Sequence, residues 1–380
     1  MEHLINPKVK DIEISGIRKF FNLVSSTKDM ISLTIGQPDF PTPNHVKEAG
    51  KKAIDEDFTT YTHNAGMIEL REAATQFVKR KYGLHYNPES EVIVTTGASE
   101  AIDISFRTIL TEDVEVILPG PVYPGYDPII RLCGATPVYA DIRPHKFKFT
   151  AEVIKPYLTD KTRCIVLPYP SNPTGVSLTK EELEEIATLI KGRNIFILAD
   201  EIYSELIYQQ EHTSIATFLR EQTIVINGLS KSHSMTGWRI GLLFAPENIA
   251  KHILKVHQYN VTCATTISQA AALEALTNGI DDAIPMKDEY EKRRDFVYNR
   301  LVNMGFEVIK PDGAFYFFVK IPNTKVNSLE YCLSLVDKAK VAVVPGSAFS
   351  KLGEGYFRLS YAYSMDTLSE ALNRIEKFLK

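Results

Sequence analysis

The stretch NIFILADEIY occupies residues 194–203. Residues 194–199 form a nearly continuous apolar run, which is expected of a strand that helices cover on both faces of a sheet. Similar short β-rich runs alternate with helical patterns before and after it, and this alternation predicts an α/β layer with a mostly parallel sheet. The other predicted strands are residues 92–96, 114–118, 163–167, 223–227 and 241–244, and the predicted helices are residues 99–110, 126–133 and 180–191.

The pattern changes near residue 285. Three long helical segments cover residues 246–258, 265–278 and 286–304. We therefore expect a large domain over residues 45–285 and a smaller α+β domain formed by residues 1–44 and 286–380. In the second part the sequence predicts strands at residues 306–309, 314–320, 341–344 and 357–363, with helices at residues 328–339 and 366–379.

The composition excludes several classes of protein. The chain has 380 residues, of which 44% are hydrophobic and 24% charged, and its net charge of -4 indicates no basic surface for nucleic acid or an anionic membrane. No apolar run approaches the roughly 20 residues of a membrane helix, and the start lacks the features of a signal peptide. The four cysteines are scattered without a CxxC pair, which favours reduced thiols, no metal site and a cytoplasmic location.

Four polar clusters follow predicted strands. Because ligands bind beyond the carboxyl ends of the strands in an open α/β sheet, we expect the clusters to meet in one crevice. The clusters are Thr96-Gly97-Ala98-Ser99-Glu100, Ser171-Asn172-Pro173-Thr174-Gly175, Asp200-Glu201-Ile202-Tyr203 and Ser230-Lys231-Ser232.

Two of the clusters have an ordinary structural explanation beside a functional one. Ala98 and Ser99 fit a strand-to-helix turn with a capping residue, but a helix N-terminus also attracts a phosphate through its free N–H groups. The second cluster is a turn by composition, and its Asn172 amide could also donate a hydrogen bond to a phenolic oxygen. The residues alone leave both alternatives open.

Asp200 directly follows the apolar run. It either caps the next segment or is partly desolvated, and a desolvated carboxylate needs a cationic partner such as a protonated pyridine nitrogen. Tyr203 follows three residues later and can point into the same site.

Lys231 follows another apolar run and lies between Ser230 and Ser232. Most lysines are solvated, but a partly desolvated lysine near cationic groups has a lowered pKa and acts as an amine nucleophile or Schiff-base residue. Arg239 follows eight residues later, and its guanidinium together with the Ser230 hydroxyl would suit a phosphate.

The motifs occur in a characteristic order along the chain. They are SNPTG at 171–175, DEIY at 200–203, SK at 230–231, GWRIG at 237–241 and RLS at 358–360. With this order, from residues 35–40 to residues 357–360, the chain resembles the class I aminotransferases, fold-type I enzymes that depend on pyridoxal 5′-phosphate (PLP). The resemblance implies a mostly parallel seven-stranded-type sheet flanked by helices, plus a smaller α+β domain. Within the family, residues 225–239 (VINGLSKSHSMTGWR) resemble the bacterial N-acetyl-L,L-diaminopimelate aminotransferases of lysine biosynthesis.

The resemblance implies three catalytic residues. Lys231 holds PLP as a Schiff base and later moves a proton from the substrate to the cofactor. Asp200 pairs with the pyridine N–H, so that the ring stays protonated and accepts negative charge. Tyr203 and Asn172 hydrogen-bond the 3′-oxygen of the ring.

It also implies the binding residues. Tyr123 stacks on the ring, and Arg358 binds the substrate α-carboxylate with help from Gly36 and Asn172. Because a tyrosine of a neighbouring subunit reaches the phosphate, a homodimer with shared active sites is expected. The phosphate-binding residues are Ala98, Ser99, Ser230, Arg239 and, from that neighbour, Tyr61.

The implied reaction is a ping-pong transamination between an L-amino acid and a 2-oxo acid, with 2-oxoglutarate and glutamate as the partner pair. A broad specificity for aromatic amino acids or aspartate is the alternative to specificity for N-acetyl-L,L-diaminopimelate. A PLP-dependent carbon–sulfur β-lyase would use the same cofactor residues. A PLP-sensing regulator is disfavoured, because the chain starts directly in the enzyme-like part and carries no basic region.

The resemblance also implies that substrate choice depends on residues 15–18 and, from the neighbouring subunit, on residues 259–262. Arg18 could meet a distal carboxylate, although a surface position is commoner for an arginine. His233 lies two residues beyond Lys231, where a packed or hydrogen-bonded core histidine is commoner than a catalytic one, and we assign it no role.

Overall fold

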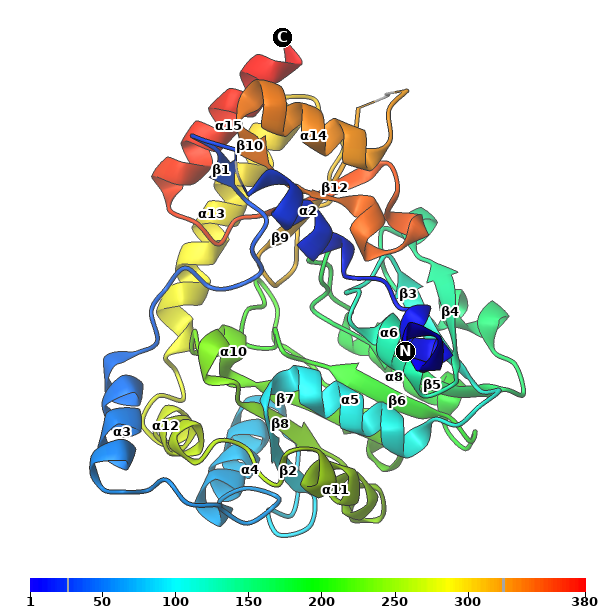
Figure 1. Cartoon of the computed structure of the whole chain (residues 1–380), viewed down its shortest axis with the longest axis vertical. Coiled ribbons are helices and arrows are strands. Elements are labelled where there is room, and N and C mark those ends of the chain that lie inside the picture. The colour runs from blue at the N-terminus through cyan, green and yellow to red at the C-terminus, as the bar shows by residue number, and fades with distance from the viewer. Residues whose placement is uncertain (26, 323–324) are drawn as a thin grey trace.

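A twisted sheet lies between two layers of helices in the first three quarters of the chain (Figure 1). The structure, a computed structural model, describes residues 1–25, 27–322 and 325–380. In these residues the sheet has seven strands in the order β2-β8-β7-β6-β5-β3-β4, all parallel except β8, which runs antiparallel to both of its neighbours. The strands are β2 (Val92–Thr95), β3 (Glu115–Gly120), β4 (Thr136–Asp141), β5 (Thr162–Leu167), β6 (Phe196–Asp200), β7 (Thr223–Gly228) and β8 (Gly241–Phe244).

The sheet buries both faces because its strands are apolar at successive positions. In β6, Ile197 and Ala199 pack into one core cluster and Leu198 packs into another, as the two-residue period of a strand requires. Residues of α4, α8 and α12 belong to the first cluster, and residues of α5, α6 and α11 belong to the second. The α/β layer predicted from the sequence is therefore confirmed.

The C-terminal part has its own core cluster and two small sheets. An antiparallel sheet has the order β11-β12-β9, and β1 pairs with β10 in parallel. The long helix α13 connects the two parts of the chain, and α2 from the N-terminal segment packs near β11 (Figure 1). The domain boundaries at residues 44/45 and 285/286 stay a prediction. The strands are β1 (Ile31–Ser32), β9 (Tyr316–Lys320), β10 (Val341–Ala342), β11 (Val344–Pro345) and β12 (Tyr356–Ser360).

Every predicted helix is present, with ends shifted by at most a few residues. No helix in the described ranges is long and apolar enough to cross a membrane. The α-helices are α1 (Pro7–Lys10), α2 (Gly16–Val24), α3 (Asn44–Asp55), α4 (Ile68–Tyr82), α5 (Gly97–Ile109), α6 (Tyr126–Leu132), α7 (Ala151–Ile154), α8 (Lys180–Ile190), α9 (Ala216–Leu219), α10 (Leu229–Ser232), α11 (Glu247–Val261), α12 (Thr266–Thr277), α13 (Ala283–Asn303), α14 (Ser328–Ala339) and α15 (Met365–Leu379).

Two strand predictions need correction, and some strands were not predicted. The strand predicted at residues 306–309 is wrong, because this segment makes only the isolated bridge between Val308 and Val319. The segment predicted as one strand at residues 341–344 contains β10 and the start of β11, which belong to two different sheets. β4 at the edge of the central sheet was not predicted.

Candidate active site

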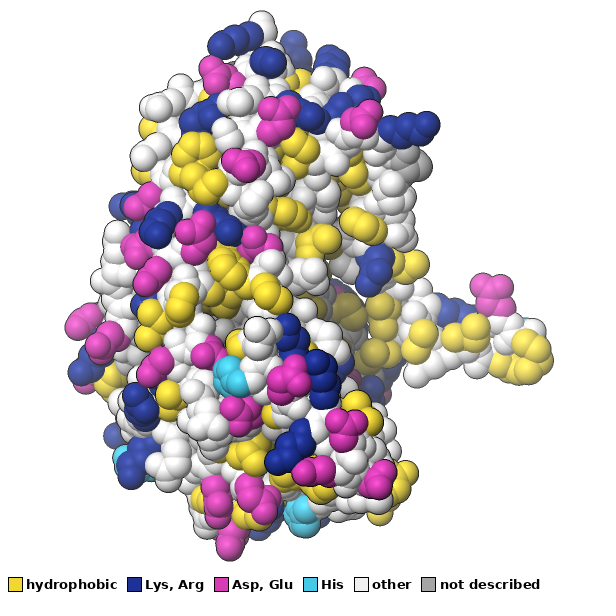
Figure 2. Space-filling view, turned by 90° about the vertical axis from the view of Figure 1, so that its left-hand side faces the viewer, with side chains coloured by type: hydrophobic (Ala, Val, Ile, Leu, Met, Phe, Trp, Pro, Cys, Tyr) yellow, Lys and Arg dark blue, Asp and Glu magenta, His cyan; other side chains and the backbone are white. Residues whose placement is uncertain are grey.

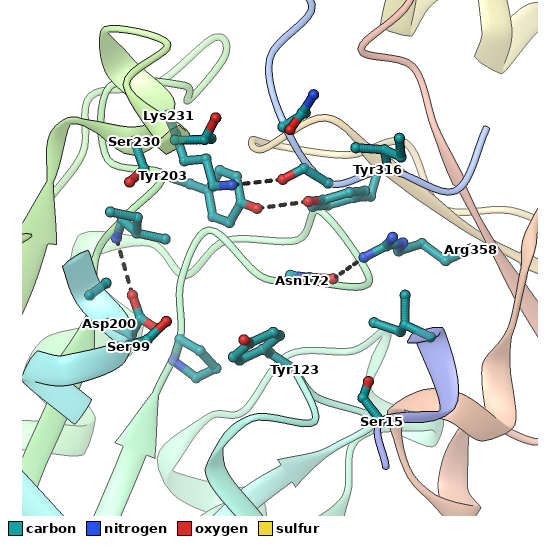
Figure 3. Close-up of a pocket in the computed structure, with 18 of the residues that line it drawn as sticks. Ser15, Ser99, Tyr123, Asn172, Asp200, Tyr203, Ser230, Lys231, Tyr316 and Arg358 are labelled. Atoms are coloured by element: carbon teal, nitrogen blue, oxygen red, sulfur yellow. Dashed lines mark hydrogen bonds between the residues drawn. The ribbon is translucent and has the colours of Figure 1, made fainter. Parts of the chain in front are cut away.

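A cleft of about 720 Å³ opens beyond the carboxyl ends of the parallel strands, between the central sheet and the C-terminal part (Figure 3). The four polar clusters meet there, as expected for an open α/β sheet. The end of β6 with the segment after it, and the short helix after β7, contribute from one side, and β9 and β12 contribute from the other. The predicted site residues that line the cleft are Gly36, Ala98, Ser99, Tyr123, Asn172, Asp200, Tyr203, Ser230, Lys231, Arg239 and Arg358.

Lys231 projects into this cleft from α10, directly after β7 (Figure 3). Its Nζ donates a hydrogen bond of 2.6 Å to the main-chain oxygen of Gly36. Burial, together with the positive charges of Arg358 and Arg239, lowers the pKa of the Lys231 amine to about 8. The amine is therefore neutral in a substantial fraction of molecules near physiological pH, which is the form that acts as a nucleophile or base.

Asp200 is the last residue of β6, and only 8% of it is exposed. Burial raises the pKa of its carboxyl, while a hydrogen bond from the Tyr126 hydroxyl to Oδ2, 2.6 Å long, acts in the opposite direction. The backbone N–H of Ile202 donates to the other oxygen, Oδ1, at 3.3 Å. A buried carboxylate with these donors is suited to a cationic ligand atom in the cleft. Tyr126 was not among the predicted site residues.

Tyr203 reaches the cleft from the loop after β6. Its hydroxyl lies 2.8 Å from the hydroxyl of Tyr316, which is on β9 (Figure 3). Burial raises the pKa of both phenols, so each keeps its proton at neutral pH. Tyr316 is a second site residue that sequence reasoning missed, because no motif marks it.

Arg358 lies on β12 and is 2% exposed. Its guanidinium donates to the side-chain oxygen of Asn172 at 2.9 Å and to the main-chain oxygen of Thr34 at 2.6 Å. Among the described residues, Arg358 Nε has no hydrogen-bond partner. No carboxylate of the described residues pairs with this buried cation, and its free donor is suited to the carboxylate of a ligand.

Hydrogen-bond donors gather at one end of the cleft, from the first turn of α5 and the residues after α10. Arg239 has a left-handed backbone with a φ of 56°, and its guanidinium lies against Gly97 so closely that a Cβ at Gly97 would collide with it. Ala98 and Ser99 follow in the first turn of α5, where backbone N–H groups are free. With the hydroxyl of Ser230, this end of the cleft has the donors that a phosphate requires.

Tyr61 does not line the cleft of its own chain. Its side chain is 83% exposed, so the structure does not bring it together with the other predicted residues. Arg18 is exposed, as expected for it, and it also lines the cleft.

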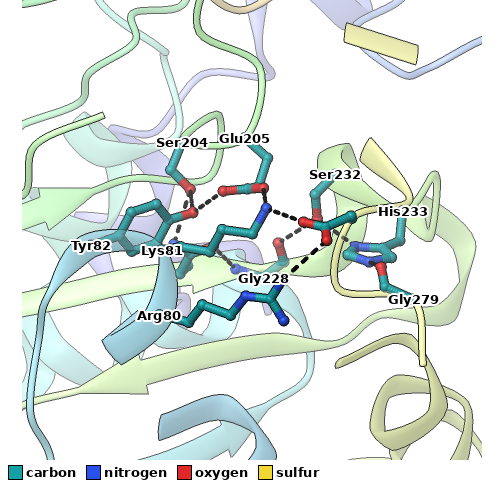
Figure 4. A network of polar contacts seen from close by, with 11 residues as sticks. Arg80, Lys81, Tyr82, Ser204, Glu205, Gly228, Ser232, His233 and Gly279 are labelled. Atoms are coloured by element: carbon teal, nitrogen blue, oxygen red, sulfur yellow. Dashed lines mark hydrogen bonds and ion pairs between the residues drawn. The ribbon is translucent and has the colours of Figure 1, made fainter. Parts of the chain in front are cut away.

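The helix that carries Lys231 contacts a polar network that lies outside the cleft (Figure 4). His233 is 1% exposed, and its ring nitrogens lie 2.8 Å from the Ser232 hydroxyl and 2.8 Å from the main-chain oxygen of Gly279. Nearby, Lys81 Nζ pairs with Glu205 at 3.1 Å and with Asp281 at 2.8 Å. The interpretation of His233 as a hydrogen-bonded core residue agrees with this arrangement.

The cleft fits PLP. Its charged lining residues are Asp200 and four cations, Lys231, Arg239, Arg358 and Arg18, so it has a surplus of positive charge for an anionic cofactor and an anionic substrate. The donors near Gly97 suit the phosphate, and the buried Asp200 suits a protonated ring nitrogen. The amine of Lys231, with its lowered pKa, suits covalent capture of an aldehyde.

Comparisons with known proteins agree with this geometry. The family model described as aminotransferase class I and II matches residues 28–375. A protein of Bacillus subtilis named "Probable N-acetyl-LL-diaminopimelate aminotransferase" is 64% identical over 379 residues, which cover 100% of this chain and 96% of the relative. The aromatic-amino-acid aminotransferase 2 of Thermococcus litoralis is 40% identical, with 99% and 98% of the two chains covered. Among solved structures, the aspartate aminotransferase from Thermus thermophilus with maleate has a TM-score of 0.94 at 35% identity, over 98% of this chain and 99% of that chain.

Proposed function

The chain belongs to the class I and II aminotransferase family, and we propose that it transfers an amino group between N-acetyl-L,L-diaminopimelate and the 2-oxoglutarate/glutamate pair. The choice of donor is supported by the 64% identity to the Bacillus subtilis relative of that name. Such a reaction would belong to lysine biosynthesis.

The observation that carries the proposal is the combination of three ionisable groups in one cleft. The Lys231 amine, with its pKa lowered to about 8, faces the same cavity as the Asp200 carboxylate and the Arg358 guanidinium. An amine that is easily deprotonated, a fixed negative charge and a carboxylate-binding cation are what transamination of an amino acid requires.

The chemistry that PLP supplies when bound is covalent capture of an amine and delocalisation of the negative charge left when the neighbouring carbon loses a proton. Lys231 Nζ would hold the cofactor covalently, and its amine would also be the base that takes the proton from the substrate Cα. Asp200 would pair with the ring nitrogen, and the hydrogen bond from the Tyr126 hydroxyl stabilises the Asp200 carboxylate. Tyr203 donates a hydrogen bond to the 3′-oxygen of the ring. General acid–base transfer by a positioned group contributes about 10²–10⁴-fold.

Two further groups of residues are assigned binding roles. Arg358 binds the substrate α-carboxylate together with Asn172 and the Gly36 backbone, and the contact between Arg358 and Asn172 supports this role. The cofactor-binding residues are Ala98, Ser99, Tyr123, Asn172, Asp200, Tyr203, Ser230, Lys231, Arg239 and, from a neighbouring subunit, Tyr61.

We also propose a homodimer in which two copies share their active sites. The exposed Tyr61 and Tyr259, which are 83% and 87% exposed, support this assembly, because large exposed aromatic side chains are characteristic of interfaces. Figure 2 shows a projecting segment with apolar side chains, and the exposed apolar residues of the N-terminal segment support a contact there. Within residues 1–14 the large ones are Met1, Leu4, Ile5, Val9 and Ile14. A cytoplasmic location is supported by the four cysteines, all of which are unpaired.

The absorbance spectrum of the purified protein with PLP tests the proposal. Wild-type protein should show a visible cofactor band that N-acetyl-L,L-diaminopimelate or glutamate removes and 2-oxoglutarate restores. The Lys231→Ala variant should lack the band of the covalently attached cofactor. A wild-type protein without any band after addition of PLP would contradict the proposal.

The same experiment separates the alternatives. If aromatic amino acids or aspartate remove the band and N-acetyl-L,L-diaminopimelate does not, the enzyme has the specificity named for the relatives that are 35–40% identical. If the band persists while added amino acids release pyruvate and ammonia, the reaction is that of a carbon–sulfur β-lyase.

A further inference from the structure

A buried histidine–glutamate pair lies directly behind the first turn of α5. His257 on α11 is 0% exposed and Glu100 on α5 is 8% exposed. His257 Nδ1 lies 2.9 Å from Glu100 Oε1. The helices α5 and α11 pack side by side (Figure 1), so the pair is sealed between them and lies outside the cleft.

The second nitrogen of the ring is also engaged. His257 Nε2 lies 2.9 Å from the main-chain oxygen of Asn64, which cannot donate, so this nitrogen must carry a proton. A hydrogen bond between His257 Nδ1 and Glu100 Oε1 requires one more proton, carried by either atom. Wherever that proton lies, the pair as a whole carries no net charge.

Glu100 also holds the turn that precedes α5. Its other oxygen, Oε2, accepts a hydrogen bond of 2.5 Å from the backbone N–H of Thr96, the residue at the N-cap position of α5. Gly97, Ala98 and Ser99 lie between this position and Glu100, and Ala98 and Ser99 line the cleft. The carboxyl group therefore supports the very turn to which the cofactor phosphate is assigned.

An anionic carboxylate at that place would oppose the binding of a phosphate. A helix N-terminus stabilises negative charge, but two anions at one N-terminus repel each other, and the repulsion is strong where water is excluded. A cation or a proton beside Glu100 is therefore needed if the phosphate is to receive the full benefit of the α5 N-terminus.

We propose that His257 is a positioning residue for the cofactor phosphate, which neutralises Glu100 and fixes the turn formed by Thr96–Ser99. The inference rests on the proposed function, in which PLP is the cofactor and Ala98 and Ser99 bind its phosphate. The His257 ring also contacts the main-chain oxygen of Asn64, three residues after the exposed Tyr61. His257 therefore connects the turn of residues 96–99 to the loop that carries Tyr61, the residue assigned to the active site of the neighbouring subunit.

The test compares two ligands that differ only in the phosphate. Cofactor-free full-length protein is titrated with PLP and, separately, with pyridoxal, and each dissociation constant is read from absorbance. In the His257→Gln variant, the dissociation constant for PLP should rise about tenfold or more, as expected when a charge near a phosphate loses its counter-charge. The dissociation constant for pyridoxal should stay within about twofold of the wild-type value, because pyridoxal has no phosphate to be repelled.

A second variant distinguishes charge from packing. Adding Glu100→Gln to His257→Gln removes the uncompensated carboxylate but keeps an amide oxygen for the Thr96 N–H. The double variant should bind PLP within about threefold of wild type, since the repulsion is absent. His252→Gln, at an exposed position on the same helix, is the matched control and should leave both dissociation constants unchanged.

Three results would overturn the inference: unchanged PLP affinity in His257→Gln, an equal loss of affinity for PLP and pyridoxal, or a double variant that binds PLP as weakly as the single one. If His257→Gln does not fold, Glu100→Gln alone decides, because it should bind PLP at least as tightly as wild type, and a clear loss of affinity contradicts the charge argument. Failure of the wild-type protein to bind PLP would instead contradict the proposed function, so the two failures are distinguishable.

Discussion

The hydroxyl of Tyr316 lies 2.8 Å from the hydroxyl of Tyr203, and this contact joins β9 of the C-terminal part to the loop that follows β6. The ring of Tyr316 also lies beneath Arg358, whose guanidinium carbon is 4.3 Å from the ring centroid. One tyrosine therefore contacts both the phenol assigned to the cofactor ring and the cation assigned to the substrate carboxylate.

Replacing Tyr316 by phenylalanine should reduce kcat/KM by about 2- to 10-fold, because the Tyr203 hydroxyl loses a partner and one neutral hydrogen bond contributes about 0.5–1.5 kcal/mol. The ring beneath Arg358 is kept, so the KM for the amino acid should change little. Steady-state kinetics of Tyr316→Phe and of Tyr298→Phe, a tyrosine outside the cleft, would test this. Equal effects of the two substitutions would contradict a role for the Tyr203–Tyr316 contact.

The positions of Asp200 and Lys231 could be predicted, because each follows an apolar strand and lies in a recognisable motif. Tyr126 and Tyr316 could not. The chain contains 18 tyrosines, and only tertiary packing brings the hydroxyls of these two within hydrogen-bonding distance of Asp200 and Tyr203. A contact between elements that are distant along the chain leaves no local pattern in the sequence.

The same limit explains the errors in the fold. The buried parallel strands were predicted because they are continuous apolar runs, whereas the edge strand β4 contains Pro137 and several half-buried residues and so lacks that signal. The segment around Val308 is apolar but makes a single bridge, which no local pattern distinguishes from a strand. The division of residues 341–344 between two sheets depends on which neighbours the chain meets.

Replacing Arg358 by lysine should lower kcat/KM for both the amino acid and the 2-oxo acid by about 10- to 100-fold. The guanidinium is held by Asn172 and Thr34, whereas a lysine cannot keep both contacts and bind a carboxylate with two donors. Hydrogen bonds to charged groups contribute about 1.5–3 kcal/mol each, which gives this range. An amine that lacks a carboxylate should react equally slowly with both proteins. A variant with unchanged KM and kcat for amino acids would show that the carboxylate binds elsewhere.

The rate at which cofactor-free protein captures PLP should rise with pH around a midpoint near 8. The Lys231 pKa is lowered from the ordinary value of 10.5 to about 8. The neutral, nucleophilic amine is therefore already the main form above pH 8. Stopped-flow absorbance between pH 6 and 10 would give the midpoint. Arg358→Gln should move it upward, because loss of a nearby positive charge favours the protonated amine, and Asp200→Asn should move it downward. A wild-type midpoint near 10.5, or one that neither substitution moves, would contradict the electrostatic argument.

Replacing Tyr126 by phenylalanine should move the acid limb of the pH profile of kcat/KM upward by about 0.5–1 pH unit. The Tyr126 hydroxyl is the principal group that opposes the effect of burial on the Asp200 pKa, so its loss raises that pKa further. Asp200 must be ionised to pair with the ring nitrogen, and a higher pKa means that this charge is lost earlier as the pH falls. One hydrogen bond of about 1 kcal/mol corresponds to roughly 0.7 pH unit. The matched control is Tyr123→Phe, because Tyr123 lines the same cleft but makes no hydrogen bond to Asp200, so its acid limb should stay at the wild-type position. An acid limb that moves equally in both variants would mean that the shift reflects loss of a phenol from the cleft and not loss of the donor to Asp200.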